Sequence, residues 1–168
     1  MPDKQILFAP WRMAYIENSE KEESPCFLCR LDPAQPLAES LLIHKDERTL
    51  LLLNRYPYNP GHLLVAPVRH VALMGDLSPE EAMDLWKLQC KAVTLLEKAM
   101  SPQGFNLGIN LGKVAGAGLP GHLHIHIVPR WNGDCNFMPV LGETKVIPQS
   151  LEETCRALRT CWEESSSW

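Results

Sequence analysis

The stretch "HLHIHIVPR", residues 122–130, alternates histidine with aliphatic residues and constrains the fold more than any other feature of the chain. In a β-strand, side chains at i, i+2 and i+4 point to the same face. We therefore expect His122, His124 and His126 to share one face, while the aliphatic residues between them pack into a core. The pattern predicts a half-buried strand.

Further strand patterns surround this one. Residues 40–71 predict three strands in an antiparallel meander, with turns at Asp46 and at "YPYNPG", and the third strand is "HLLVAPV". "GFNLGINLG" predicts another strand and leads into the glycine-rich loop "KVAGAGLPG". With the histidine strand, these patterns indicate an antiparallel sheet of about five strands.

One long helix follows the meander. Ser78, Pro79 and Glu81 form a capping-box pattern, and the helix they begin is expected to end near Met100. A terminal helix is expected over residues 149–162. Two blocks of strands around one helix, without βαβ alternation, indicate an α+β fold. The apolar residues at helical spacing in the long helix are Met83, Leu85, Trp86, Leu88, Val93 and Leu96.

Composition narrows the classes of partner and compartment. The 168 residues suit one domain, and a net charge of -4 with a pI near 5.9 disfavours a nucleic-acid partner. No apolar run approaches the ~20 residues of a membrane helix, so no membrane partner is expected. The first residues lack a secretory pattern, and six cysteines in that context argue against a disulfide framework. These features predict a cytoplasmic protein.

The pair Cys26 and Cys29, in "CFLC", predicts either a metal knuckle or a redox pair. A tetrahedral zinc site needs two more ligands, and His70 and His122 are the candidates if the ends of their strands converge. Four protein ligands would leave no open position, so such a zinc would be structural.

Two chemistries fit the histidine strand. The three imidazoles could bind one catalytic metal, or one of them could be a covalent nucleophile whose neighbours orient it and bind oxyanions. The loop "GKVAGAGLPG" favours the second, because glycine lets backbone N–H groups approach an anion closely. No Asp or Glu lies near in the sequence to complete a catalytic metal site. A histidine that reacts with phosphate is the better hypothesis.

Three segments carry a family resemblance: "HLHIHIV", "LLLNRYPYNPGHLLVAPVRHV" and "NLGINLG". In this order they resemble the histidine-triad (HIT) superfamily of nucleotide hydrolases and transferases. The resemblance covers residues 26–131 and implies a single HIT domain over 1–168, with an N-terminal extension (1–25) and a C-terminal extension (132–168). Segments in both extensions are similar to the bacterial diadenosine tetraphosphate phosphorylase branch.

The resemblance implies roles for five residues. His124 would attack the α-phosphate of a dinucleoside polyphosphate, adenine being the expected base, and carry the nucleoside monophosphate before water or inorganic phosphate accepts it. His126 would contact the transferring phosphate, and His62 would orient the nucleophile's ring. Asn54 fits the ribose contact, and Asn110 fits the contact to phosphate or leaving group. The family also implies a homodimer.

The glycine-rich loop departs from the family pattern. Gly118 and Leu119 stand where many family hydrolases carry Gln and Ser or Thr. We expect the backbone amides of Gly116, Ala117 and Gly118, or the Lys113 side chain, to replace those contacts.

Several alternatives stay open. Phosphorolysis is as compatible with the altered loop as hydrolysis, and a divalent cation accompanying the substrate is compatible too. The rival functions are a purine nucleoside phosphoramidase, a nucleotide-binding regulatory module with little turnover, and a metal-dependent hydrolase that uses all three histidines.

Overall fold

The computed structural model describes residues 26–134 and 150–165. The sequence "FMPVLGETKVIP" favours irregular structure or a short strand, but this segment and the N-terminal extension lie outside the described residues.

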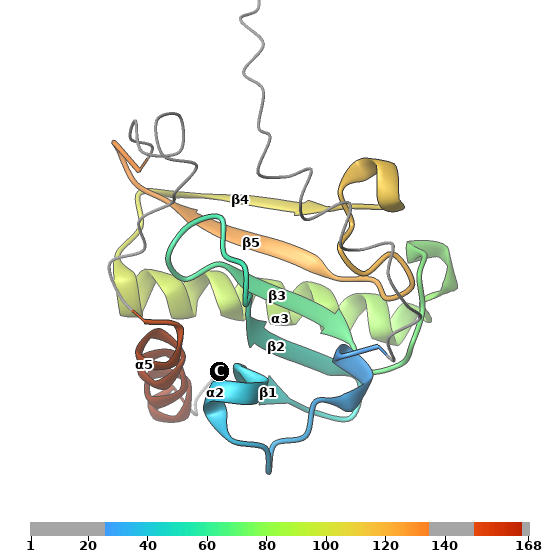
Figure 1. The fold of residues 1–168 in the computed structure, drawn as a ribbon, viewed down its shortest axis with the longest axis horizontal. Helices are drawn as coiled ribbons and strands as arrows, with labels where there is room; N and C mark the ends of the chain where they lie inside the picture. Colours follow the sequence, from blue (N-terminus) through green and yellow to red (C-terminus); the bar gives the residue numbers. More distant parts are fainter. Residues whose placement is uncertain (1–25, 135–149, 166–168) are drawn as a thin grey trace, which may run out of the picture.

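The described chain forms one five-stranded sheet in the order β1-β2-β3-β5-β4, with every pair of neighbours antiparallel (Figure 1). This confirms the predicted α+β fold and the meander of the first three strands. The last strand inserts between β3 and β4, which brings the histidine segment beside the strand that follows "NPG". The strands are β1 (Leu42–Lys45), β2 (Thr49–Leu53), β3 (Leu63–Pro67), β4 (Gly104–Ile109) and β5 (Ile125–Arg130).

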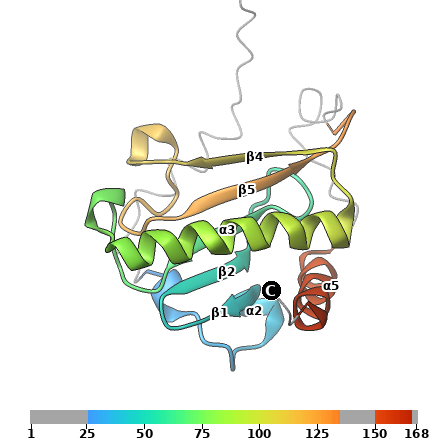
Figure 2. The same cartoon turned by 180° about the vertical axis from the view of Figure 1, so that it is seen from behind.

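Helices lie mainly on one side of the sheet. The long helix α3 crosses one face, and α5 packs against α3 and β1 (Figure 2). Within residues 26–134 and 150–165, three short 3-10 helices and one short α-helix make the connections. The bounds are η1 (Leu28–Arg30), α2 (Leu37–Ser40), η2 (Met74–Asp76), α3 (Pro79–Met100), η3 (Lys113–Ala115) and α5 (Leu151–Glu164).

The capping box predicted for the long helix is present. The Ser78 hydroxyl accepts from the Glu81 amide at 3.2 Å, and the Glu81 carboxylate accepts from the Ser78 amide at 2.8 Å. Arg69 also donates to this carboxylate, and that hydrogen bond, with the one from Ser78, lowers the pKa of Glu81 to about 2. Two orphan amides of the first turn are thereby satisfied, which explains why the helix begins here.

The sheet buries two separate apolar layers. Leu51, Leu53, Leu63 and their neighbours pack against α3, whereas Leu52 and Leu64 point to the opposite face. Leu28 and Leu31, from the segment beginning at Cys26, cover part of that second face. Among the described residues, this segment covers the β1 side of the face opposite α3, which is the face to which His126 points.

Two apolar residues of α3 are not in the core. Leu85, Leu88 and Leu96 are buried as predicted, but Met83 and Trp86 are 53% and 64% exposed. The predicted helical stripe was too wide because helical spacing alone does not tell where the buried face ends.

No helix within residues 26–134 and 150–165 has the length and apolar character to cross a membrane.

Candidate functional site

The candidate site lies where the loop between β2 and β3 meets the segment leading into β5, on the face opposite α3. His126 pairs with Leu64 of β3, and His62 comes directly before β3. The strand itself begins at Ile125, so His122 and His124 precede it and the predicted strand of 122–130 was too long. The tertiary structure nevertheless packs the rings of His124 and His126 at 5.0 Å between centroids.

Gly61 brings the chain into position for His62. Its φ is +74°, and a Cβ there would lie 2.5 Å from the Met100 sulfur. Glycine adopts this conformation freely, whereas any other residue would be strained there and would have to displace the Met100 side chain. The "NPG" turn therefore delivers His62 to the histidine cluster, where it is fully buried.

A chain of hydrogen bonds sets the protonation of two imidazoles. The Tyr58 amide donates to Nδ1 of His62 at 3.0 Å, so the proton of neutral His62 is on Nε2. His62 Nε2 is 2.9 Å from Nδ1 of His126, which must accept. The proton of neutral His126 is therefore on Nε2. Among the described residues, this Nε2 is the buried side-chain nitrogen or oxygen that lacks a hydrogen-bond partner.

His124 takes the opposite tautomer. Its Nδ1 lies 2.8 Å from the carbonyl oxygen of His122, an acceptor, so Nδ1 carries the proton. The lone pair of His124 is then on Nε2, which has no hydrogen-bond partner among the described residues. Two neighbouring rings thus offer a nucleophilic lone pair and an N–H donor, which is what a phosphate-transfer site requires.

The place of His62 differs in one respect from our expectation. We predicted that it orients the ring of His124, whereas its 2.9 Å hydrogen bond is to His126, whose ring then contacts His124. The Tyr58 ring lies over His126, with centroids 5.8 Å apart and planes 17° from parallel. Tyr58 was not among the predicted site residues, although an aromatic residue four positions before His62 in a proline-rich loop could have suggested it.

Burial keeps His126 neutral. Desolvation first, and the neighbouring His124 second, lower the pKa of His126 to about 4. Near neutral pH the ring is thus held as the neutral tautomer described above, with Nε2–H available as a donor.

The low pKa of His126 predicts how stability depends on pH. Between pH 6.5 and 4 the unfolded chain binds a proton at this residue that the folded chain does not, so unfolding becomes easier as pH falls. The free energy of unfolding changes by at most about 1.4 kcal/mol per pH unit, and the change is smaller here because the ring is only partly buried. Thermal unfolding of wild type and His126→Asn from about pH 7.5 to about pH 4.5 should show the steeper decline in wild type. Parallel curves would contradict this assignment.

The two predicted asparagines lie beside the histidines. The Asn54 amide is 3.3 Å from Nδ1 of His62, and its carbonyl accepts from the Tyr56 amide at 3.0 Å. Asn110 donates to the Gly116 carbonyl at 3.4 Å and so ties β4 to the glycine-rich loop. Both have local structural partners, and their contacts to substrate stay predictions.

The glycine-rich loop uses two of the three amides expected to bind phosphate. The Gly116 amide donates to Lys113 at 2.9 Å, and the Ala117 amide donates to Gly112 at 3.3 Å. Ala117 is buried, while Lys113 and Gly118 are exposed. The loop's own turn thus occupies these amides, and Gly118 with Lys113 are the predicted contacts that stay available.

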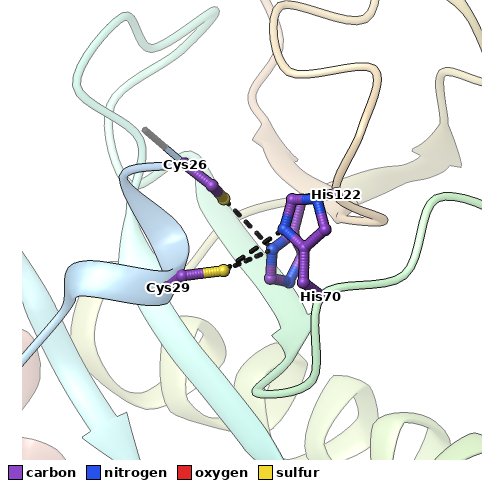
Figure 3. Close-up of side chains that lie close together, drawn as sticks. All are labelled: Cys26, Cys29, His70 and His122. Carbon is purple, nitrogen blue, oxygen red and sulfur yellow. Dashed lines mark hydrogen bonds between the residues drawn. The ribbon is translucent and has the colours of Figure 1, made fainter. Parts of the chain in front are cut away.

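The two cysteines and the first triad histidine form a separate cluster with His70 (Figure 3). Cys26 Sγ is 3.2 Å from Nδ1 of His122, and Cys29 Sγ is 3.2 Å from Nδ1 of His70. All four donor atoms lie within 4.8 Å of one another. Zinc bonds of about 2.3 Å to sulfur and 2.0–2.1 Å to nitrogen put tetrahedral sulfur and nitrogen ligands roughly 3.6 Å apart, so the set fits such an ion.

The surroundings of His122 prepare it as a metal ligand. Its Nε2 lies 2.8 Å from the Pro67 carbonyl, so Nε2 carries the proton and Nδ1 presents a lone pair to the cysteines. Burial lowers the pKa of His122, which favours the neutral form that binds metals. Burial and Cys26 raise the pKa of the Cys29 thiol, so a cation is needed to stabilise two thiolates here.

This cluster bears on the metal-triad alternative. Among the described residues, the group of donors close enough to share an ion contains His122 but neither His124 nor His126. His122 thus lies in the Cys/His cluster whereas His124 and His126 do not, and a single metal held by all three is not supported.

A cavity of about 340 Å³ lies away from His62, His124 and His126, between the β1–β2 turn, α3 and the end of α5. It contains none of the predicted site residues. His44 lines it and packs against Trp162 with ring centroids 4.8 Å apart. Several of its charged groups form ion pairs, among them Arg48 with Asp84 at 2.6 Å and His44 with Asp46 at 3.5 Å.

A five-stranded antiparallel sheet with a long helix on one face and alternate histidines on the other defines a histidine-triad protein. The chain belongs to the HIT family: the family model described as "HIT domain" matches residues 35–133.

Similar proteins agree with this assignment. The chain is 41% identical over 166 residues to a protein named AP-4-A phosphorylase from Mycobacterium tuberculosis. The alignment covers 94% of this chain and 84% of that protein. It is 36% identical over 139 residues to a bis(5'-adenosyl)-triphosphatase from Dictyostelium discoideum, and this alignment covers 78% of this chain and 91% of that protein. The structure resembles that of a Zn-bound histidine triad family protein from Mycobacterium smegmatis, with a TM-score of 0.65 and 28% sequence identity. The superposition covers 85% of this chain and 96% of that chain.

Proposed function

We propose that this chain is a nucleotidyl-transferring enzyme that acts on the α-phosphate of dinucleoside polyphosphates through a nucleotidyl group on His124. The observation that carries this proposal is the complementary pair of tautomers: a lone pair on His124 Nε2 beside the N–H of His126. Relatives named as an AP-4-A phosphorylase and a bis(5'-adenosyl)-triphosphatase support the substrate class.

In the first step, Nε2 of His124 attacks the α-phosphorus. A P–N bond forms as the P–O bond to the rest of the polyphosphate breaks. The His122 carbonyl stabilises the imidazolium by accepting from its Nδ1–H. His126 Nε2–H donates to an oxygen of the transferring group, and the buried hydrogen bond to His62 holds the ring in that orientation.

In the second step, an acceptor attacks the same phosphorus and the P–N bond breaks, which returns the lone pair to His124. Inorganic phosphate as the acceptor gives a nucleoside diphosphate, whereas water gives a nucleoside monophosphate. The loop without Gln and Ser or Thr leaves room for either acceptor, and the Gly118 amide and Lys113 are the groups we assign to its binding.

Product analysis tests the reaction. With diadenosine tetraphosphate, phosphorolysis gives ADP and ATP, whereas hydrolysis gives AMP and ATP. Chromatography after reaction with and without inorganic phosphate separates these outcomes, and mass spectrometry after brief mixing should detect an acid-labile adenylyl adduct on His124. Turnover of an adenosine phosphoramidate alone would instead support the phosphoramidase alternative. Adenine nucleotide binding without turnover of either would support the regulatory alternative.

The Cys26, Cys29, His70 and His122 cluster is proposed to bind a structural zinc. The donor set and the hydrogen bond of His122 to Pro67 support this, as does the Zn-bound relative of similar fold. Four protein ligands leave no position for substrate, so the ion would hold the N-terminal segment against the site and supply no Lewis-acid chemistry. The five cysteines within the described ranges are free thiols, which is compatible with the cytoplasmic location we predict.

A homodimer is proposed from two exposed features. Met83 and Trp86 present an apolar surface on α3, and β4 is an edge strand whose Leu107 is 49% exposed. Such surfaces on a small protein mark contact sites. We expect wild type to sediment at twice the 19.0 kDa chain mass, and Trp86→Glu to shift it toward the monomer. A wild type that sediments as a monomer would contradict the proposal.

A further inference from the structure

The strand β4 borders the histidine pair and offers unusual room there. Gly108 pairs with His126 and Asn106 pairs with Val128, so both point to the face opposite α3. Phe105 and Ile109 alternate with them and pack toward the core against α3. The site face of this strand thus presents an asparagine and a glycine in succession beside His126.

Gly108 leaves the space beside His126 open. A Cβ built on Gly108 meets no heavy atom within 4 Å. Directly opposite residues in an antiparallel pair have Cβ atoms about 4.5–5.5 Å apart, so any side chain at 108 would lie alongside His126. On the other flank of His126, Leu64 and Leu52 are buried together with Leu28 and Leu31. Within the described residues, the open flank of His126 is the one over β4.

Asn106 has a settled orientation and an available donor. Arg130 donates to its Oδ1 at 2.7 Å, and guanidinium groups cannot accept, so the NH₂ group points away from Arg130. Asp134 holds Arg130 in place with two hydrogen bonds. The Asn106 NH₂ is exposed and has no hydrogen-bond partner among the described residues. It lies about 7 Å along the strand from Gly108, the spacing of alternate residues.

We propose that Gly108 and Asn106 form the subsite for the leaving group, and that Gly108 determines how large this group can be. The inference rests on the proposed function and specifies its substrate. As the P–O bond breaks, the leaving oxygen departs as an anion, and the Nε2–H of neutral His126 stabilises it by donating a hydrogen bond. The remaining nucleoside polyphosphate passes over Gly108 and accepts a hydrogen bond from the Asn106 NH₂. A small leaving group such as ammonia never reaches these two residues.

Two substrates that differ only in the leaving group test this proposal. Diadenosine tetraphosphate and adenosine 5'-phosphoramidate deliver the same adenylyl group to His124. We expect Gly108→Val to lower kcat/KM for the tetraphosphate by roughly 10- to 100-fold or more, and to change the phosphoramidate by less than about 3-fold. Asn106→Asp, which places a negative charge near the polyphosphate, should raise KM for the tetraphosphate by about 10-fold with little effect on the phosphoramidate.

Gly104→Val is the matched control. Gly104 is on the same face of β4 with equally open space, but it pairs with Arg130 at the far end of the strand. This variant should keep the wild-type ratio of the two substrates, since valine suits an edge strand. Equal losses on both substrates in Gly108→Val, or the same selective loss in Gly104→Val, would overturn the inference while leaving the proposed function intact. A wild type that turns over neither substrate and forms no adduct would overturn both.

Discussion

Replacing His124 with alanine is expected to lower kcat on diadenosine tetraphosphate by at least about 10³-fold, because the variant has no group to form the P–N bond. The acid-labile adduct should disappear in the same variant. Steady-state product formation and rapid-quench mass spectrometry measure the two effects. His44→Ala is the matched control, since this histidine packs against Trp162 on the other side of the sheet and should retain activity.

Nucleotide binding separates loss of chemistry from loss of the site. The side chain of His124 is 7% exposed and its removal leaves His62, His126 and Asn54 in place. We therefore expect calorimetric titration with AMP to give a Kd within about 10-fold of wild type. An adduct that persists in His124→Ala and moves to His126 would show that the two tautomers have been assigned the wrong way round.

Replacing Cys29 with serine is expected to remove the metal. Wild type should hold close to one zinc per chain by elemental analysis, and Cys29→Ser should hold little, because a neutral hydroxyl is a poor substitute for a thiolate ligand. Loss of a structural zinc removes folding free energy, so the melting temperature should fall by several degrees or more. Cys90→Ser, an exposed cysteine on α3, is the control and should keep both metal and stability.

Acid should release the same metal. Burial and Cys26 raise the pKa of Cys29, so protons compete with the cation for its sulfur increasingly as pH falls. Zinc retained per chain after dialysis at decreasing pH measures this competition, and chelator treatment near neutral pH should mimic it. Full zinc content in both Cys29→Ser and His122→Ala would place the metal elsewhere.

Local patterns were sufficient for much of the fold. Ser78, Pro79 and Glu81 set the start of α3 because a capping box acts through adjacent backbone amides. Alternation placed Ile125 and Ile127 in the core and His126 on the other face, since strand geometry repeats every two residues. The family motifs led to the HIT assignment. The proximity of Cys26 and Cys29 to His70 and His122 could be predicted because the two histidines lie near the ends of the neighbouring strands β3 and β5.

Other features depended on contacts between distant segments. The wide apolar stripe of α3 gave no sign that Trp86 would be exposed. The amides of Gly116 and Ala117 looked available but serve the loop's own turn. Both features depend on which surfaces pack together in the folded chain, and the periodicity of the sequence does not predict that packing.

The sequence by itself determined the sheet and helix, the family, and the set of residues able to bind a metal or attack phosphorus, because these follow from spacing and residue chemistry. Only the tertiary structure decided which ring nitrogen of each histidine carries the proton. A proton's position on an imidazole depends on the partner of each nitrogen, and the partners of His62, His124 and His122 are the Tyr58 amide, the His122 carbonyl and the Pro67 carbonyl. Backbone N–H and C=O groups have the same chemistry at every position, so residue types do not show which of them will contact a given histidine. The fold brings these groups within hydrogen-bond distance.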